Sequence, residues 1–347
     1  MRTLTVTAPA KINLSLDVLE RLPTGYHRLA MIMQTIGLSD TLHLEMRPEG
    51  ISLACDDERI TGAVAQGDGD ESPNYVANGT PDGSISRLPG GAPSGLTGGP
   101  PIGSADGFPH IDEIPLDSRN LAWRAAEAFF TRLAETSGLA DPDLHGVHIR
   151  LTKRIPSAAG LAGGSADAAA VLRGLNALHG FPFSAADLAT MGVRLGADVP
   201  YCLRGGTCLA EGIGEILTPL PSFAGHWLVL VKPPVSVSTP WVFSRLRLDD
   251  LGERPDNAAL CGRVAEGDLN GLARGMRNVL ERVTEPAHPE IAAIRERMLA
   301  LGALGSRMSG SGPSVFGLFP NEMTAKRAQD TISREWPACW AVPTVDG

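Results

Sequence analysis

Apolar residues recur at every second position in the first part of the chain. Such spacing puts the apolar side chains on one face of an extended strand, so it predicts an N-terminal β-sheet. Because the alternation reaches a lysine by position 11, the segment does not have the pattern of a signal peptide. The positions that carry this pattern are residues 2–7, Ile12, Leu14, Leu16, Val18, Leu42 and Leu44.

The middle of the chain has helical and strand spacing in turn. Asn120 is a favourable N-cap, and apolar residues follow it at helical spacing as far as Leu133. Alternation over residues 147–151 predicts a strand. Two helices are predicted after it, one with apolar residues from 171 to 178 and one over 184–195, which opens with a sequence close to a capping box.

A chain of 347 residues is long enough for two domains. The Pro-Leu-Pro-Ser sequence at 219–222 marks the expected boundary, which gives domains 1–221 and 222–347. The second is predicted to be an α+β unit with strands at 227–231 and 314–319 and helices around 269–283, 290–301 and 324–336. Residues 61–110 contain 12 glycines and 7 prolines, which predicts an inserted loop or disordered segment.

The composition excludes several classes of partner. Acidic residues outnumber basic ones by 39 to 30, for a formal charge of −9, so no uniform basic surface for nucleic acid or anionic lipid is expected. No stretch approaches the roughly 20 apolar residues of a membrane span. Five cysteines without a Cys-x-x-Cys pair indicate a reducing cytoplasm. We therefore expect a cytoplasmic protein, monomeric or homodimeric, that acts on a small molecule.

The segment between the strand at 147–151 and the next helix consists of small residues. Its backbone N–H groups could approach an anion, and the following helix would point its positive dipole end at the same place. The alternative is a tight connection whose glycines only permit unusual backbone angles. The chain contains no Walker A loop and no Rossmann fingerprint. The candidate phosphate-binding residues are Pro156, Ser157, Ala158, Ala159, Gly160, Leu161, Ala162, Gly163, Gly164, Ser165 and Ala166.

Three other features could carry chemistry. A second small-residue loop at 307–314 precedes an apolar strand, and the two loops together favour a shared nucleotide site. Asp198 follows a helix end and is either a turn former or a carboxylate that orients a hydroxyl for phosphoryl transfer. Lys11, one of only four lysines, interrupts a strand with an otherwise apolar pattern. It lies either on a solvated strand face or beside charge that develops in a reaction.

Tyr26 and His27 follow a turn at residues 23–25. An aromatic ring beside an imidazole could stack on a nucleobase and hydrogen-bond to its edge. The alternative is a turn that contains a half-buried tyrosine.

Together these motifs resemble those of the GHMP kinase superfamily, which includes galactokinase, homoserine kinase and mevalonate kinase. The glycine-rich loop is shared across the superfamily, whereas the Gly-Tyr-His turn and the Gly-Ala-Asp-Val-Pro segment point to a member that acts on a cytidine nucleotide. The resemblance spans both ends of the chain and omits mainly residues 61–110. The matching segments are residues 8–14, 25–27, 156–169, 195–200, 211–215 and 309–312.

The resemblance implies a two-domain α+β fold, with an N-terminal α/β domain, a ferredoxin-like C-terminal domain and an active site in the cleft between them. It implies ATP-dependent phosphorylation of the 2-hydroxyl of a cytidine-diphosphate-linked methylerythritol, in non-mevalonate isoprenoid precursor synthesis. By the matched positions, Asp198 would be the catalytic carboxylate, Lys11 its partner, and residues 156–166 would surround the ATP phosphates. Tyr26, His27 and Phe243 would hold the cytosine, and Asn13 would touch the reacting hydroxyl.

The sequence departs from the superfamily loop at four alanines, which replace residues that are usually glycine or serine. An alanine keeps its backbone donor as long as φ stays negative, so a phosphate cradle remains feasible. The hydroxyl that the superfamily pattern has at position 166 is absent from Ala166, whereas Ser165 still supplies a hydroxyl. The resemblance therefore predicts Mg²⁺ held mainly through the ATP phosphates and no metal ligand set of the protein. The four positions are Ala158, Ala159, Ala162 and Ala166.

Two other functions would fit parts of this pattern. Another GHMP small-molecule kinase, of the homoserine or mevalonate type, would keep both loops but would not need Tyr26, His27 and Phe243. A non-catalytic relative that senses a ligand would not need both Lys11 and Asp198.

Overall fold

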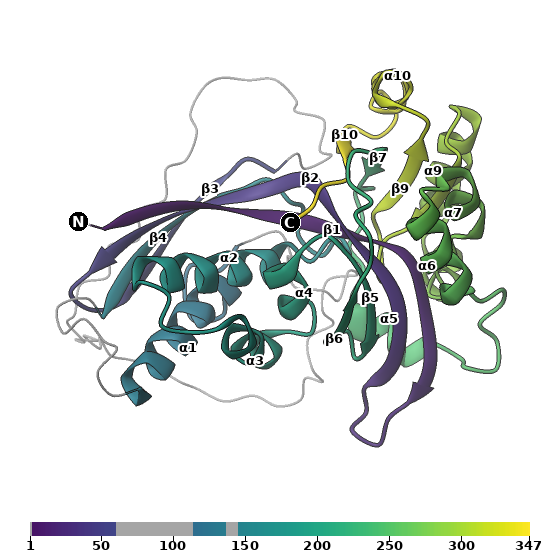
Figure 1. Cartoon of the computed structure of the whole chain (residues 1–347). Coiled ribbons are helices and arrows are strands. Elements are labelled where there is room, and N and C mark those ends of the chain that lie inside the picture. The colour runs from purple at the N-terminus through teal and green to yellow at the C-terminus, as the bar shows by residue number, and fades with distance from the viewer. Residues whose placement is uncertain (1, 60–113, 137–144) are drawn as a thin grey trace, which may run out of the picture.

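The structure is a computed structural model that describes residues 2–59, 114–136 and 145–347. It contains two β-sheets with helices packed against them, in agreement with the predicted α+β class (Figure 1). The expected insertion at residues 61–110 lies outside the described residues.

The first sheet is built around two long, curved strands, β1 (Thr3–Arg21) and β2 (His27–Arg47), which pair with each other in antiparallel fashion (Figure 1). On its other edge β2 pairs with β4 through one half and with β5 through the other. This pairing gives the order β3-β4-β2-β5-β6, with β1 beside β2. The remaining strands are β3 (Ile51–Asp57), β4 (Gly146–Lys153), β5 (Thr207–Gly212) and β6 (Ile216–Pro219).

The alternation along β1 separates the core from the site. Ile12 and Leu14 are fully buried in a cluster that also contains Phe316 of the second sheet. Because side chains alternate between the faces of a strand, Lys11 and Asn13 point the other way. A residue pattern predicted as a simple core strand therefore carries a polar face as well.

Helices α1, α2 and α4 pack on one face of the first sheet, and α3 packs against these three helices (Figure 1). The predicted caps are confirmed: Asn120 Oδ1 accepts from Ala122 N at 2.9 Å, and Ser184 forms a capping box with Asp187. The four helices are α1 (Leu121–Glu135), α2 (Gly163–Leu178), α3 (Ala185–Leu195) and α4 (Val199–Arg204).

The second sheet has the antiparallel order β10-β7-β9-β8. Numbered within this unit, the order is 4-1-3-2, which is the ferredoxin-like arrangement that the resemblance implied. Its strands are β7 (Trp227–Val231), β8 (Gly305–Met308), β9 (Val315–Phe319) and β10 (Cys339–Pro343). Its helices are α5 (Thr239–Arg245), α6 (Asn257–Glu266), α7 (Leu269–Gly275), α8 (Glu281–Ala287), α9 (Pro289–Ala300) and α10 (Glu322–Ile332).

The prediction of a single helix at 269–283 is wrong, because α7 ends at Gly275 and α8 begins at Glu281. The chain between them forms a bridge with Leu16 of β1: Leu16 N donates to Arg277 O at 2.9 Å, and Val279 N donates to Leu16 O at 3.1 Å. The Asn278 side chain also donates to Gly310 O at 2.8 Å. These long-range bonds compete with helical ones and interrupt the helix.

β6 ends at Pro219 and β7 begins at Trp227, so the boundary that we propose after residue 221 falls in the connection between the two sheets. In the described ranges, every helix is too short or too polar to cross a membrane.

Two glycines inside helices have opposite surroundings. A Cβ added to Gly174 of α2 would lie 2.4 Å from Leu44 Cδ1, in the buried core, whereas one added to Gly262 of α6 would meet nothing within 4 Å. We expect Gly262→Ala to raise the free energy of unfolding by about 0.5–1 kcal/mol through helix propensity. Gly174→Ala should lower the free energy of unfolding, because overpacking costs about 1–3 kcal/mol and this cost exceeds the gain from helix propensity. Denaturant unfolding of both variants measures the two signs, and stabilisation by Gly174→Ala would show that Leu44 moves aside freely.

Candidate active site

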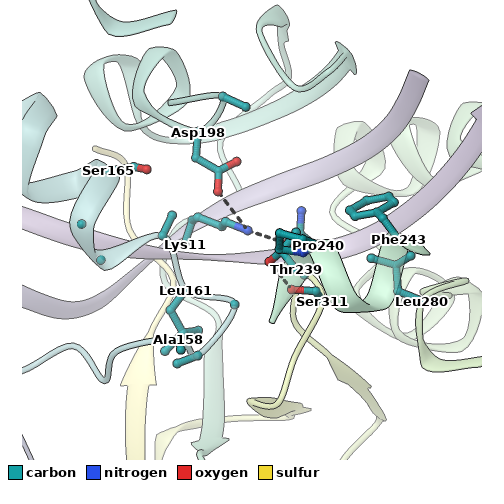
Figure 2. Close-up of a pocket in the computed structure, with 18 of the residues that line it drawn as sticks. Lys11, Ala158, Leu161, Ser165, Asp198, Thr239, Pro240, Phe243, Leu280 and Ser311 are labelled. Carbon is teal, nitrogen blue, oxygen red and sulfur yellow. Dashed lines mark hydrogen bonds and ion pairs between the residues drawn. The ribbon is translucent and has the colours of Figure 1, made fainter. Parts of the chain in front are cut away.

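A cavity of about 1120 Å³ is lined by residues from both parts of the chain. Residues of the first sheet and its helices form one side, and α5 together with the loop at 309–312 forms the other. Apart from Ala166, every residue predicted for the site lines this cavity: Lys11, Asn13, Tyr26, His27, Asp198, Phe243 and the run 156–165. Figure 2 shows part of this wall.

The start of α2 faces the cavity without a side-chain cap. The first N–H that bonds within the helix is that of Ala166, which donates to Ala162 O at 2.8 Å. The N–H groups of Gly163, Gly164 and Ser165 precede this bond, and the first N–H groups of a helix have no partner within it. Ala166 itself is buried and its donor is used, so its assignment to the phosphate cradle is not supported by the geometry.

Two alanines of this loop adopt backbone angles that favour glycine. Ala158 has φ 48° and Ala162 has φ 57°. The condition that φ stays negative at the substituted positions is therefore not met at these two. A left-handed alanine costs roughly 1–2 kcal/mol, and such strain persists where surrounding contacts impose it.

The two small-residue loops touch each other. Ser309 Oγ donates to Gly160 O at 2.9 Å, and a Cβ on Gly160 would lie 2.1 Å from Ser309 O. The first loop is also tied to β1, because Lys11 N donates to Leu161 O at 3.1 Å. The glycine at position 160 thus permits a close approach that brings both loops to one cavity, as the sequence predicted.

Lys11 and Asp198 come together at the centre of the cavity wall (Figure 2). Lys11 Nζ lies 3.8 Å from Asp198 Oδ2 and donates to Asn13 Oδ1 at 2.7 Å. Asp198 occupies the N-cap position of α4, yet its side chain makes no capping hydrogen bond. Its carboxylate is therefore directed to the cavity and to Lys11, and not to the helix that it precedes.

The three predicted base contacts all line the cavity, and two of them touch each other. The rings of His27 and Phe243 stack with centroids 4.9 Å apart and planes inclined by 26°, while Tyr26 is 62% exposed. Burial, and then the charge of Arg21, lower the pKa of His27 below its ordinary value. The imidazole is therefore neutral at pH 7 and has one donor and one acceptor nitrogen.

The sequence analysis missed a buried charge cluster behind the phosphate loop. Lys153, at the end of β4, forms ion pairs with Asp40 and with Asp167, the latter at 2.7 Å. Burial raises the pKa of Asp167 to about 7, and its Oδ1 has no hydrogen-bond partner. The two carboxylates raise the pKa of Lys153 despite its burial. The scarcity of lysine was the one sequence signal that pointed to this position.

A second missed feature joins the C-terminal loop to α5. Thr239 and Ser311, which both line the cavity, share a hydrogen bond of 2.7 Å between their hydroxyls (Figure 2). This bond connects the loop at 309–312 to the helix that carries Phe243.

Comparisons with known proteins agree with this geometry. Residues 120–206 match the GHMP kinases N terminal domain, and residues 258–338 match the GHMP kinases C terminal family. The chain is 40% identical to 4-diphosphocytidyl-2-C-methyl-D-erythritol kinase of Acetivibrio thermocellus, over 99% of this chain and 100% of that protein.

Solved structures show the same fold. A crystal structure of 4-(cytidine 5'-diphospho)-2C-methyl-D-erythritol kinase superposes with a TM-score of 0.70 at 31% identity, covering 99% of this chain and 100% of the other. A homoserine kinase from Cytophaga hutchinsonii superposes with a TM-score of 0.65 at 19% identity, over 100% and 95% of the two chains, and shows the fold alone.

The two-sheet fold and the two family matches make this chain a GHMP kinase, a small-molecule phosphotransferase that uses ATP. Within that class, the 40% sequence identity over 99% of the chain shows which family the protein belongs to. The chain belongs to the family of 4-diphosphocytidyl-2-C-methyl-D-erythritol kinases.

The buried Asp167 predicts a pH-dependent stability. Its pKa in the folded state, about 7, lies above the value of about 3.9 for an unfolded aspartate. Its folded-state environment therefore favours the protonated form, and stability is lost as the pH rises toward 7, by at most about 1.4 kcal/mol per pH unit. We expect Asp167→Asn, which cannot ionise, to lose less free energy of unfolding than the wild type between pH 5 and 8.

Glu281, whose pKa burial also raises to about 7, is present in both proteins, so only their difference reports on Asp167. Glu127→Gln, on the exposed face of α1, is the control and should keep the wild-type slope. Equal slopes for Asp167→Asn and the wild type would show that Asp167 stays ionised throughout.

Proposed function

We propose that this protein transfers the γ-phosphoryl group of ATP to the 2-hydroxyl of 4-diphosphocytidyl-2-C-methyl-D-erythritol, in non-mevalonate isoprenoid precursor synthesis. The observation that carries the proposal is the placement of the 3.8 Å pair Lys11–Asp198 in one cavity with two other features. On one side is the open start of α2, and on the other are the rings of His27 and Phe243.

The phosphates of ATP bind at the start of α2. The N–H groups of residues 163–165 supply fixed donors, and the helix dipole adds positive potential at the same point. The loop from Pro156 to Ala162 surrounds them on the β4 side, and the contact between Gly160 and Ser309 closes the cradle.

Asp198 and Asn13 orient the hydroxyl, and Asp198 accepts its proton. The hydroxyl oxygen attacks the γ-phosphorus, the bond from that phosphorus to the oxygen of the β-phosphate breaks, and ADP leaves. Lys11 lies where it stabilises the negative charge on the transferred group. Its position between the Asn13 amide oxygen and the Asp198 carboxylate keeps the ammonium in place.

Mg²⁺ fits this site mainly as an ion bound to the ATP phosphates. Within residues 2–59, 114–136 and 145–347, no three His, Cys, Asp or Glu side chains are grouped to hold a metal. The Ser165 hydroxyl, at the cavity wall near Gly196, is the side chain of the phosphate loop that would reach such an ion. When bound, Mg²⁺ neutralises phosphate charge.

The cytosine is held by Tyr26, His27 and Phe243. Stacking on Phe243 supplies affinity, and Tyr26, which is exposed, is free to cover the base. His27 now lies on a face of Phe243, so it must leave that ring to reach the edge of the base. The acceptor nitrogen of a neutral imidazole can then accept a hydrogen bond from the amino group of cytosine. Uracil has a carbonyl oxygen at that position and cannot donate this bond.

The homoserine and mevalonate types of GHMP kinase are not favoured, because their similarity to this chain is in the fold alone. A ligand-sensing relative is not favoured either, because Lys11 and Asp198 are both present and paired. Turnover of ATP with the cytidine substrate decides between a kinase and a sensor. That the protein is cytoplasmic, and that it is a monomer or a homodimer, remain our predictions.

We expect Asp198→Asn to lower kcat by about 10²–10⁴ because the amide cannot accept the proton of the hydroxyl. Substrate affinity and the free energy of unfolding should change little. Steady-state kinetics and calorimetric binding of the substrate measure the two effects. Asp187→Asn, which removes a carboxylate from the α3 capping box, is the control that should keep normal turnover. Near-normal kcat in Asp198→Asn would make Asp198 a turn residue only.

Tyr26, Phe243 and His27 should contribute differently to recognition of the base. Tyr26→Ala and Phe243→Ala each remove stacking of about 1–3 kcal/mol, so each should raise the KM for the cytidine substrate by roughly tenfold or more. His27→Ala also relieves the His27–Phe243 stack, so its affinity loss should be smaller, but it should reduce the preference for cytidine over uridine. KM for ATP should stay the same in all three variants.

Phe181→Ala, which removes an exposed ring outside the cavity, is the control for these measurements. If the cytidine substrate bound all three site variants as tightly as the wild type, the base would have to bind elsewhere.

A further inference from the structure

Lys11 and Asp198 belong to elements that are packed together but not hydrogen-bonded as one sheet. Lys11 lies on β1, inside the first sheet, and Asp198 begins α4, a helix of six residues on the face of that sheet. The separation of their charged atoms, 3.8 Å, therefore depends on how firmly α4 is held against the strands.

A buried hydrogen bond spans the same gap. Thr35 of β2 lies directly opposite Lys11 in the β1–β2 register, and Tyr201 lies in α4, three residues after Asp198. Thr35 Oγ1 and the Tyr201 hydroxyl are 2.9 Å apart, and both residues are almost completely buried. The Tyr201 hydroxyl donates to Gly206 O at 2.7 Å, so in this bond Thr35 is the donor.

The Thr35 end of this bond is fixed from several directions. Its N–H donates to Gly206 O at 3.1 Å, and its carbonyl accepts from Val345 N at 3.0 Å. The Gln34 side chain also donates to Val345 O at 2.9 Å, which holds the C-terminal segment against β2. The α4 end is followed by Gly205 and Gly206, which both have positive φ. Because Gly206 is tied to Thr35 after the helix ends, the Tyr201 hydroxyl supplies a bond to β2 from inside α4, three residues from Asp198.

We propose that Tyr201 is a positioning residue for phosphoryl transfer, which through its hydrogen bond to Thr35 holds Asp198 at its distance from Lys11. Tyr201 does not line the cavity and touches no reacting atom. A misplacement of a reacting group by 1 Å can cost about 10²-fold in rate. Loss of this one hydroxyl thus acts on kcat, while the phosphate loop and the base contacts remain as they are.

The proposal rests on the proposed function, and its test uses the full-length protein with ATP and the cytidine substrate. Tyr201→Phe and Thr35→Val each remove the bond, whereas Thr35→Ser keeps the hydroxyl. Ser306→Ala is the control, because Ser306 of β8 is a buried serine that donates to Phe316 O at 2.9 Å within the second sheet. It should lower stability without lowering kcat.

We expect Tyr201→Phe and Thr35→Val each to lower kcat by about tenfold or more, with KM for both substrates unchanged. Tyr201→Phe also removes the bond to Gly206 O, so the double variant should be no slower than Tyr201→Phe alone. Thr35→Ser should restore kcat. A crystal structure of Tyr201→Phe should show Lys11 Nζ and Asp198 Oδ2 farther apart than 3.8 Å.

Wild-type protein without turnover of the cytidine substrate would reject the proposed function, and the distance in the Tyr201→Phe structure would still decide the positioning role. An active wild type with a kcat for Tyr201→Phe and Thr35→Val within about twofold of it would overturn the positioning role alone. The same holds if Ser306→Ala lowers kcat equally, or if the Lys11–Asp198 distance is unchanged. If Tyr201→Phe does not fold, Thr35→Val with its Thr35→Ser rescue tests the same bond.

Discussion

The burial of two lysine ammonium groups beside the cavity is the constraint on which the site depends. A cation taken out of water costs several kcal/mol unless carboxylates and other acceptors surround it. Lys11 is only 4% exposed and Lys153 only 5%, so each needs acceptors close to its ammonium group. Lys11 obtains them from Asn13 and Asp198, and Lys153 obtains them from Asp40 and Asp167.

Each of these pairings also joins two layers of the fold. The Lys11 pair connects β1 to the start of α4, and the Lys153 cluster connects β4 to α2 just after the phosphate loop. Asp40 adds to this second connection, because its Oδ1 accepts from Ile155 N at 2.8 Å at the beginning of the loop. The Lys11 pair and the Lys153 cluster thus follow the same rule: each buried cation is surrounded by acceptors.

The parts of the site that could be predicted from sequence are those with local signals. Helix caps such as Asn120 and Ser184 depend on residues two or three positions away, and the phosphate loop is recognisable as a run of small residues between a strand and a helix. The parts that could not be predicted depend on partners far away in the chain. Lys153 looks like an ordinary strand end until Asp40 is placed beside it, and the break at Asn278 follows from bonds to Leu16 and Gly310.

The backbone angles of the phosphate loop could not be predicted from local signals either. Nothing in the identity of Ala158 or Ala162 indicates a positive φ, because that conformation is imposed by the contact of the loop with β1 and with Ser309. The resemblance to a kinase superfamily supplied the grouping of Lys11, Asp198 and the aromatic residues, which spacing alone does not provide. The His27–Phe243 stack was not foreseen either, since it joins β2 to α5 across the cavity.

A chain with a formal charge of −9 can still bind a polyphosphate because its donors are placed locally. The run 156–166 contains no arginine or lysine, so in the proposed function the phosphates meet N–H groups, whose donors are fixed in the backbone and do not titrate. Such donors hold ATP and the transition state about equally, and uniform binding of this kind does not raise kcat. The difference must come from a charge placed at the transferred group. In the proposed function Lys11 supplies that charge. Because Asp198 lies 3.8 Å away, beyond hydrogen-bond distance, the Lys11 ammonium keeps donor capacity for the phosphoryl group as charge develops there.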